Sequence, residues 1–100
     1  CVGSLILANA KLIDRIESTA DWKSLARMEN EFKNVKVCKD KHFVEDGNII
    51  TSAGISAGID MALHIVKRYF GGEVAKATAK HMEYPYMIEN KRKIVLDSFL

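Results

Sequence analysis

A helical segment with almost no polar face lies near the start of the chain, and it restricts the possible folds more than any other feature. The spacing of its apolar residues predicts a buried helix from about Ser4 to Ile13. A helix that is apolar all round must be covered on several sides. We therefore expect a layered α/β domain, and we expect part of its cover to come from residues outside this chain.

The rest of the sequence predicts alternating helices and strands. The expected elements are a strand at 16–19, a helix from Trp22 to Phe32, a strand over 35–39, a hairpin joining 42–44 to 49–51, a helix ending at Phe70 before Gly71-Gly72, and a helix from Glu73 to Met82. Asp46-Gly47 indicates the hairpin, with a four-residue loop over 45–48. Asp21 is expected to cap the second helix. The segment 94–96 fits a strand or a helix. The segment 16–19 fits only a short strand, and without it three strands remain, two of them in the hairpin. Three strands are fewer than a typical sheet of four to six contains, so the domain is expected to be incomplete in this chain.

Composition excludes several classes of protein. The chain is 48% hydrophobic and 28% charged, which argues against disorder. Its net charge of +2 gives no reason to expect a nucleic-acid or membrane partner, and the basic cluster at 91–93 is interpreted as a solvated face. No apolar run approaches the roughly 20 residues that a membrane span needs. Two cysteines make a poor disulfide framework, which favours a reducing, cytoplasmic setting.

Two segments resemble the ThiJ/PfpI superfamily. Residues 46–66, DGNIITSAGISAGIDMALHIV, are similar to its isonitrile hydratase-like branch and to related domains of AraC-type regulators. Residues 1–8, CVGSLILA, resemble the nucleophile elbow of the same family, where a cysteine follows a strand and opens a helix. Residues 82–84 resemble the segment after the last family helix. The resemblance covers about residues 1–84 and leaves 85–100 unmatched.

The resemblance implies a flavodoxin-like three-layer α/β/α sandwich. Residues 1–100 would then form the carboxy-terminal part of a single domain, whose amino-terminal half is a missing partner. The family also implies a homodimer and a small-molecule substrate or ligand. We expect no cofactor, and we expect no metal because the three histidines lack the spacing of metal ligands.

Cys1 is the candidate catalytic residue. A thiolate is the reactive form of cysteine, and a helix N-terminus lowers the thiol pKa because its N–H groups favour negative charge. The N–H groups of Val2 and Gly3 would stabilise an anion developing on the substrate. From the residues alone, an alternative remains: Cys1 is a small apolar side chain at the end of a fragment. Cys38 is interpreted as a bystander without a disulfide to Cys1.

The family pattern points to further pocket residues. The resemblance places Ala53 and Gly54 near the pocket, where they would shape the substrate space. Asp21 stands where the branch has a histidine before the tryptophan, and Val2 where it has a hydroxyl-bearing residue. Asp21 therefore has two interpretations, a helix cap, which we prefer, and a polar group near the thiol. His64 is interpreted as a flanking or interface residue.

Three classes of function are compared. The resemblance implies a hydro-lyase in which Cys1 attacks an isocyanide carbon and water releases an N-substituted formamide. The second class is a non-enzymatic sensor or regulator that detects a ligand or oxidant through the same cysteine. The third is an N-terminal-nucleophile amidohydrolase, which requires a strand after the nucleophile, whereas residues 3–10 predict a helix. We rank the hydro-lyase narrowly first, and whether the chain is an enzyme stays open here.

Overall fold

The computed structural model describes residues 1–86 and Asn90. Its elements, in order, are α1 (Gly3–Asn9), β1 (Glu17–Ser18), α2 (Leu25–Glu31), β2 (Lys36–Val37), β3 (Phe43–Asp46), β4 (Ile49–Ser52), α3 (Ile55–Phe70) and α4 (Gly72–His81). The basic cluster at 91–93 and the ambiguous segment at 94–96 lie outside the described residues. Within the described part of the chain, no helix combines the length and the apolar character that crossing a membrane demands.

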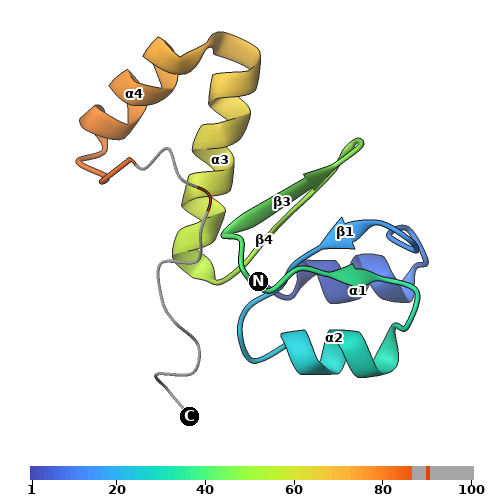
Figure 1. The fold of residues 1–100 in the computed structure, drawn as a ribbon. Coiled ribbons are helices and arrows are strands. Elements are labelled where there is room, and N and C mark those ends of the chain that lie inside the picture. The colour runs from blue at the N-terminus through green and yellow to red at the C-terminus, as the bar shows by residue number, and fades with distance from the viewer. Residues whose placement is uncertain (87–89, 91–100) are drawn as a thin grey trace.

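The four strands form two small sheets. β1 and β2 pair in parallel, with Glu17 opposite Lys36, whereas β3 and β4 pair as an antiparallel hairpin. Two hydrogen bonds join the sheets: the Glu17 N–H donates to Asp46 Oδ2 over 2.8 Å, and the Thr19 N–H donates to Thr51 Oγ1 over 2.9 Å. Figure 1 shows α1 beside β1, α3 beside the hairpin, and α4 folded back along α3, and α2 packs against β2.

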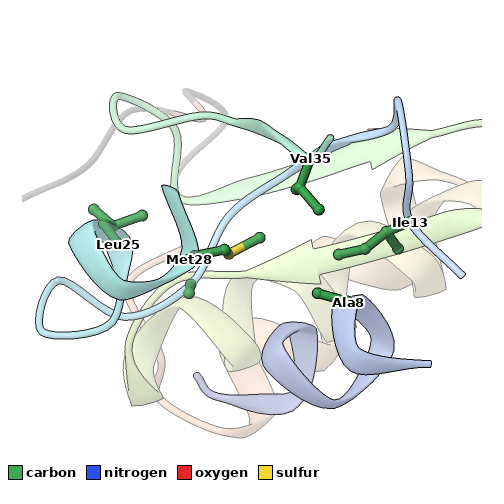
Figure 2. Close-up of a cluster of buried hydrophobic side chains, with 6 residues drawn as sticks. Ala8, Ile13, Leu25, Met28 and Val35 are labelled. Atoms are coloured by element: carbon green, nitrogen blue, oxygen red, sulfur yellow. The ribbon is translucent and has the colours of Figure 1, made fainter. Parts of the chain in front are cut away.

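The main apolar core lies where α1 and α2 meet the first sheet. Figure 2 shows side chains from both helices and the segments around them converging on one another. The buried members are Ala8, Ile13, Ala20, Leu25, Met28 and Val35. Ile49 of β4 packs against this group and connects the hairpin to it. Burial of these side chains is the main favourable term that holds the elements together.

Helix α1 is shorter than the sequence predicts. Lys11 adopts a positive φ of 61°, the Lys11 N–H bonds to the Ala8 carbonyl, and the Leu12 N–H bonds to the Leu7 carbonyl. This pair of bonds closes a helix with a left-handed residue after its cap. The predicted continuation to Ile13 is therefore wrong. The prediction that α1 needs further cover agrees with the exposure of Ile6, which is 71% accessible.

Helix α2 begins three residues later than expected. The cap position is Ser24, and its side chain makes no capping hydrogen bond. Asp21 instead lies at the start of a turn, where its carbonyl oxygen accepts the Ser24 N–H over 3.0 Å. The prediction that Asp21 caps this helix is wrong, because the intervening turn places it outside the first helical residues.

The hairpin is tighter than the sequence predicts. Asp46 and Ile49 are paired in the strand register, so the loop contains only Gly47 and Asn48. Gly47 has a φ of 63°, a conformation that glycine adopts without steric cost. The four-residue loop is therefore a wrong prediction, since Glu45 and Asp46 continue the strand.

The two last helices agree with their predicted positions to within one or two residues. Gly71 separates them with a φ of 95°, which confirms that the glycine pair stops the first of them. At the end of α4, Glu83 has a φ of 53° and the Tyr84 N–H bonds to the Ala79 carbonyl over 2.9 Å. The helix thus ends before Pro85, as predicted.

Met28 provides a direct test of the core. We expect Met28→Ala to lower the free energy of unfolding by about 2–5 kcal/mol, because Met28 is fully buried and truncation leaves a cavity. Met82→Ala is the matched control; its side chain is 51% accessible, and a change of about 0.5 kcal/mol or less is expected. Urea titration measures both, and equal effects would contradict the assignment of the core.

Candidate functional site

Cys1 lies directly before α1 and its side chain is exposed. Two hydrogen bonds fix its position. Its terminal amino group donates to the Ser52 carbonyl over 3.2 Å, and its carbonyl oxygen accepts the Asp21 N–H over 3.0 Å. Figure 1 shows the N-terminus beside the end of β4 and the start of α3. Cys1 is therefore held between the hairpin and the turn after β1.

A cleft of about 280 Å³ opens next to Cys1. Cys1 and α1 line one part of it, β4 lines another, and Met61 of α3 completes the lining. The full lining is Cys1, Gly3, Ser4, Leu7, Ile50, Thr51, Ser52 and Met61. The lining combines hydroxyl and main-chain polar groups with apolar side chains, a combination typical of sites that bind small molecules.

The predicted oxyanion residues lie at the start of α1. Val2 is the cap residue and Gly3 is the first helical residue, which also lines the cleft. The first N–H groups of a helix have no partner within it, so this end of α1 offers donors beside the thiol. Their role in stabilising an anion stays a prediction.

The Asp21 N–H is hydrogen-bonded to the Cys1 carbonyl, and the Asp21 carboxylate has a buried oxygen atom. Its Oδ1 atom is buried, and no donor among residues 1–86 and Asn90 reaches it. A buried carboxylate oxygen without a donor is energetically costly. Asp21 does not line the cleft, but this free acceptor next to the Cys1 main chain favours the functional interpretation over the cap.

Ala53 and Gly54 come directly after the cleft wall rather than forming it. Ala53 is buried, and its N–H donates to the His42 carbonyl over 2.8 Å. Gly54 is the cap residue of α3. Their role in shaping the pocket stays a prediction. The lining residues Ile50, Thr51 and Ser52 belong to the same family-like segment, yet only the structure shows that they line the same cleft as Cys1.

Cys38 has a different environment from Cys1. The two cysteines are free thiols, and Cys38 Sγ donates to Asp40 Oδ1 over 3.1 Å. Burial, together with the hydrogen bond to Asp40, raises the pKa of the Cys38 thiol. A raised thiol pKa lowers the thiolate fraction at neutral pH, so Cys38 is a poor nucleophile.

The histidines lie outside the cleft. His42 is buried and pairs with Asp60, whereas His64 is partly exposed and pairs with Glu45. The His42–Asp60 pair was missed in the sequence because its members lie 18 residues apart on different elements. Across the described residues, three or more of the side chains His, Cys, Asp and Glu nowhere gather closely enough to hold a metal ion.

The part of the chain that forms the cleft matches a known protein family. The model of the DJ-1/PfpI family matches residues 1–68, which include Cys1, the cleft walls and most of α3. The chain belongs to the DJ-1/PfpI family. This confirms the predicted resemblance, and the cleft lies within the part of the chain that the family model matches.

Curated relatives have several functions. The chain is 36% identical over 84 residues to the HTH-type transcriptional regulator GbdR of Pseudomonas aeruginosa, covering 84% of this chain and 23% of that protein. It is 34% identical over 84 residues to isonitrile hydratase of Pseudomonas putida, covering 84% of this chain and 36% of the hydratase. The chain thus spans about a quarter of the length of the regulator and little more than a third of the length of the hydratase.

A solved structure supports the fold. The crystal structure of Drosophila melanogaster DJ-1beta superimposes with a TM-score of 0.67 at 28% identity, covering 86% of this chain and 45% of that chain. The predicted flavodoxin-like α/β class is confirmed for this DJ-1/PfpI chain.

The environment of Cys38 leads to a pH prediction. Asp40→Asn removes a negative charge and a charged hydrogen-bond partner that both raise the Cys38 pKa. The variant thiol should therefore ionise at lower pH and react faster with iodoacetamide between pH 7 and 8. The measurement is mass-spectrometric labelling of Cys38 in a Cys1→Ser background. Slower labelling in the variant would contradict the assigned role of Asp40.

Proposed function

We propose that this DJ-1/PfpI chain carries a nucleophilic cysteine that acts on a small molecule in the cleft beside it, with isonitrile hydration as the reaction. The observation that carries the proposal is the position of Cys1, an exposed thiol at the rim of a cleft, directly before the first N–H groups of α1. The identity of 34% with an isonitrile hydratase supports the choice of reaction.

The proposed reaction has two steps. The Cys1 thiolate adds to the terminal carbon of R–N≡C, and that carbon takes up a proton to give the thioimidate R–N=CH–S–Cys. Water then adds to the same carbon, the C–S bond breaks, and R–NH–CHO leaves with the thiol restored. Atoms balance as isocyanide plus water giving formamide, with no change of oxidation state at sulfur.

The surrounding groups have defined roles in this proposal. The N–H groups of Val2 and Gly3 would stabilise negative charge that develops during addition. Asp21, whose buried Oδ1 lacks a donor within the described chain, is the polar group that we propose near the thiol, and it does not contact a substrate in the cleft. The acid that protonates the carbon would come from the upstream half of the domain.

A second function is favoured by other relatives. GbdR and CdhR of Pseudomonas aeruginosa, at 36% and 33% identity, are transcriptional regulators by name. In this alternative, the same cleft binds a ligand, or Cys1 reacts with an oxidant, without turnover. The two functions share the site and differ in whether a product is released.

The upstream half of the domain is the partner that we propose for the exposed apolar surface. A groove of about 350 Å³ between α3 and α4 is lined almost entirely by apolar atoms. Ile55, one of its lining residues, is 85% accessible. The solved DJ-1beta chain contains about as much structure again beyond the part matched here, since the match covers 45% of it.

Two further expectations belong to this proposal. A homodimer is the expected assembly on the family resemblance, and a mass measurement in solution tests it. The two free thiols support the reducing, cytoplasmic setting proposed for the protein.

The nucleophile is tested by its pH profile. In the complete protein carrying Cys38→Ser, we expect iodoacetamide to label Cys1 with a midpoint clearly below the ordinary thiol value of about 8.5. Cys1→Ser should abolish this labelling. A midpoint at the ordinary value would contradict the activated nucleophile.

Turnover separates the enzyme from the regulator. With a small alkyl isocyanide as the substrate probe, we expect NMR to show many equivalents of formamide per protein, and Cys1→Ser to reduce the rate to background. Binding at one equivalent without formamide, in a protein whose Cys1 is activated, would instead support the regulator.

The apolar groove generates a separate prediction about assembly. When the chain is produced as a separate polypeptide with the upstream half, we expect the two to purify together. Ile55→Asp should weaken this association by placing a charge on the buried face. Lys76→Asp, a charge change at an exposed position of α4 outside the groove, is the control and should have little effect. Equal loss in both variants would contradict docking at the groove.

A further inference from the structure

A polar cluster outside the cleft joins the start of the hairpin, α3 and the segment after α4. His42 Nδ1, at the start of β3, lies 2.5 Å from Asp60 Oδ2 on α3. The Tyr84 hydroxyl, just after α4, donates to Asp60 Oδ1 over 2.7 Å and lies 3.2 Å from the Ser56 carbonyl. The carboxylate thus accepts from a ring N–H and a phenol at once. We call these three side chains the His42–Asp60–Tyr84 cluster.

The histidine–aspartate pair of the cluster is largely shielded from solvent, whereas Tyr84 is partly exposed. The side chains of His42 and Asp60 are 9% and 10% accessible. Burying such a pair costs desolvation free energy, so it adds little stability over a well-packed apolar contact. Directional hydrogen bonds in a buried network do, however, fix one relative placement of the elements that they join. The cluster is therefore better explained by a requirement for geometry than by stability.

The main chain next to the cluster contacts residues that line the Cys1 cleft. The His42 carbonyl accepts the Ala53 N–H over 2.8 Å, and the preceding residue, Ser52, lines the cleft. The Ser52 carbonyl in turn accepts the Cys1 nitrogen over 3.2 Å. On the other side of the cluster, Asp60 is followed by Met61, which also lines the cleft. Two lining residues, Ser52 and Met61, are thus next in the chain to residues that the cluster or its main chain holds in place.

We propose that the His42–Asp60–Tyr84 cluster positions the walls of the Cys1 cleft. The inference rests on the proposed function of Cys1. By fixing β3 and α3 relative to each other, the cluster keeps the Ser52 carbonyl where it orients Cys1 towards the start of α1. The hydrogen bond from Tyr84 to Asp60 also fixes the segment after α4 relative to α3. The three side chains are positioning residues, because none of them lines the cleft.

The chain contains a matched pair for comparison. His64 Nε2 on α3 lies 3.0 Å from Glu45 Oε1 on β3, so the same two elements are joined by the same side-chain types. These side chains are 30% and 29% accessible, Arg68 also binds Glu45, and neither member lines the cleft. Loss of this outer pair should weaken the same junction without disturbing the cleft.

The experiment compares Asp60→Asn and Tyr84→Phe with Glu45→Gln in the complete protein, all in the Cys38→Ser background. Three quantities are measured: the thermal midpoint, the pH profile of Cys1 alkylation by iodoacetamide, and hydrogen exchange of the Ala53 amide. We expect Asp60→Asn and Tyr84→Phe to raise the alkylation midpoint and to slow labelling at pH 7 about tenfold, as one pKa unit of lost activation requires. Ala53 exchange should accelerate by a similar factor.

The control and the second variant keep the result interpretable. Glu45→Gln should leave the alkylation profile and Ala53 exchange within about twofold of the parent, whatever its thermal midpoint. Tyr84→Phe removes a single hydroxyl, so it decides the question if Asp60→Asn does not fold.

The outcomes separate this inference from the function on which it rests. A lower thermal midpoint with an unchanged pH profile and unchanged Ala53 exchange would overturn the positioning role and leave the nucleophile intact. An ordinary thiol midpoint in the parent protein would overturn the proposed function. In that case Ala53 exchange still decides the positioning of the wall: acceleration in Tyr84→Phe but not in Glu45→Gln supports it, and equal exchange overturns it.

Discussion

The site depends on two hydrogen bonds of Cys1, one from its terminal amino group and one to its carbonyl oxygen, which hold it between otherwise separate parts of the chain. The Ser52 carbonyl and the Asp21 N–H bind the two main-chain polar groups of one residue. Through them, the hairpin and the turn after β1 are fixed relative to the start of α1. The cleft exists because these elements approach without closing the space beside the thiol.

The two cysteines show how environment separates chemically identical groups. Cys1 is exposed at a cleft, next to the donors at the start of a helix, whereas Cys38 donates to a carboxylate that helps to raise its pKa. Membership of the DJ-1/PfpI family places the first in the part of the chain that the family model matches. The relatives of this chain include both an isonitrile hydratase and transcriptional regulators.

Polar contacts between elements have a different role from the apolar core. The core around Met28 joins α1, α2 and the first sheet by non-directional burial. The hairpin and α3 are joined in addition by two histidine–carboxylate pairs, one buried and one exposed. The buried pair lies next to cleft residues along the chain, so the geometry of the cleft depends on a contact that contributes direction more than stability.

The sequence by itself determined the family, the order of helices and strands, the glycine stop at Gly71 and the candidate nucleophile. These features are local, because periodicity, glycine conformation and a continuous motif are written in neighbouring residues. The end of α1 before Lys11 was missed because a lysine in the left-handed region has no clear sequence signal. Only the tertiary structure decided that Ser52 lines the same cleft as Cys1, that Asp21 has a buried oxygen with no donor in the described part of the chain, and that His42 meets Asp60. Each of these depends on pairing between segments far apart in the chain, where packing and strand register, rather than local preference, select the partner.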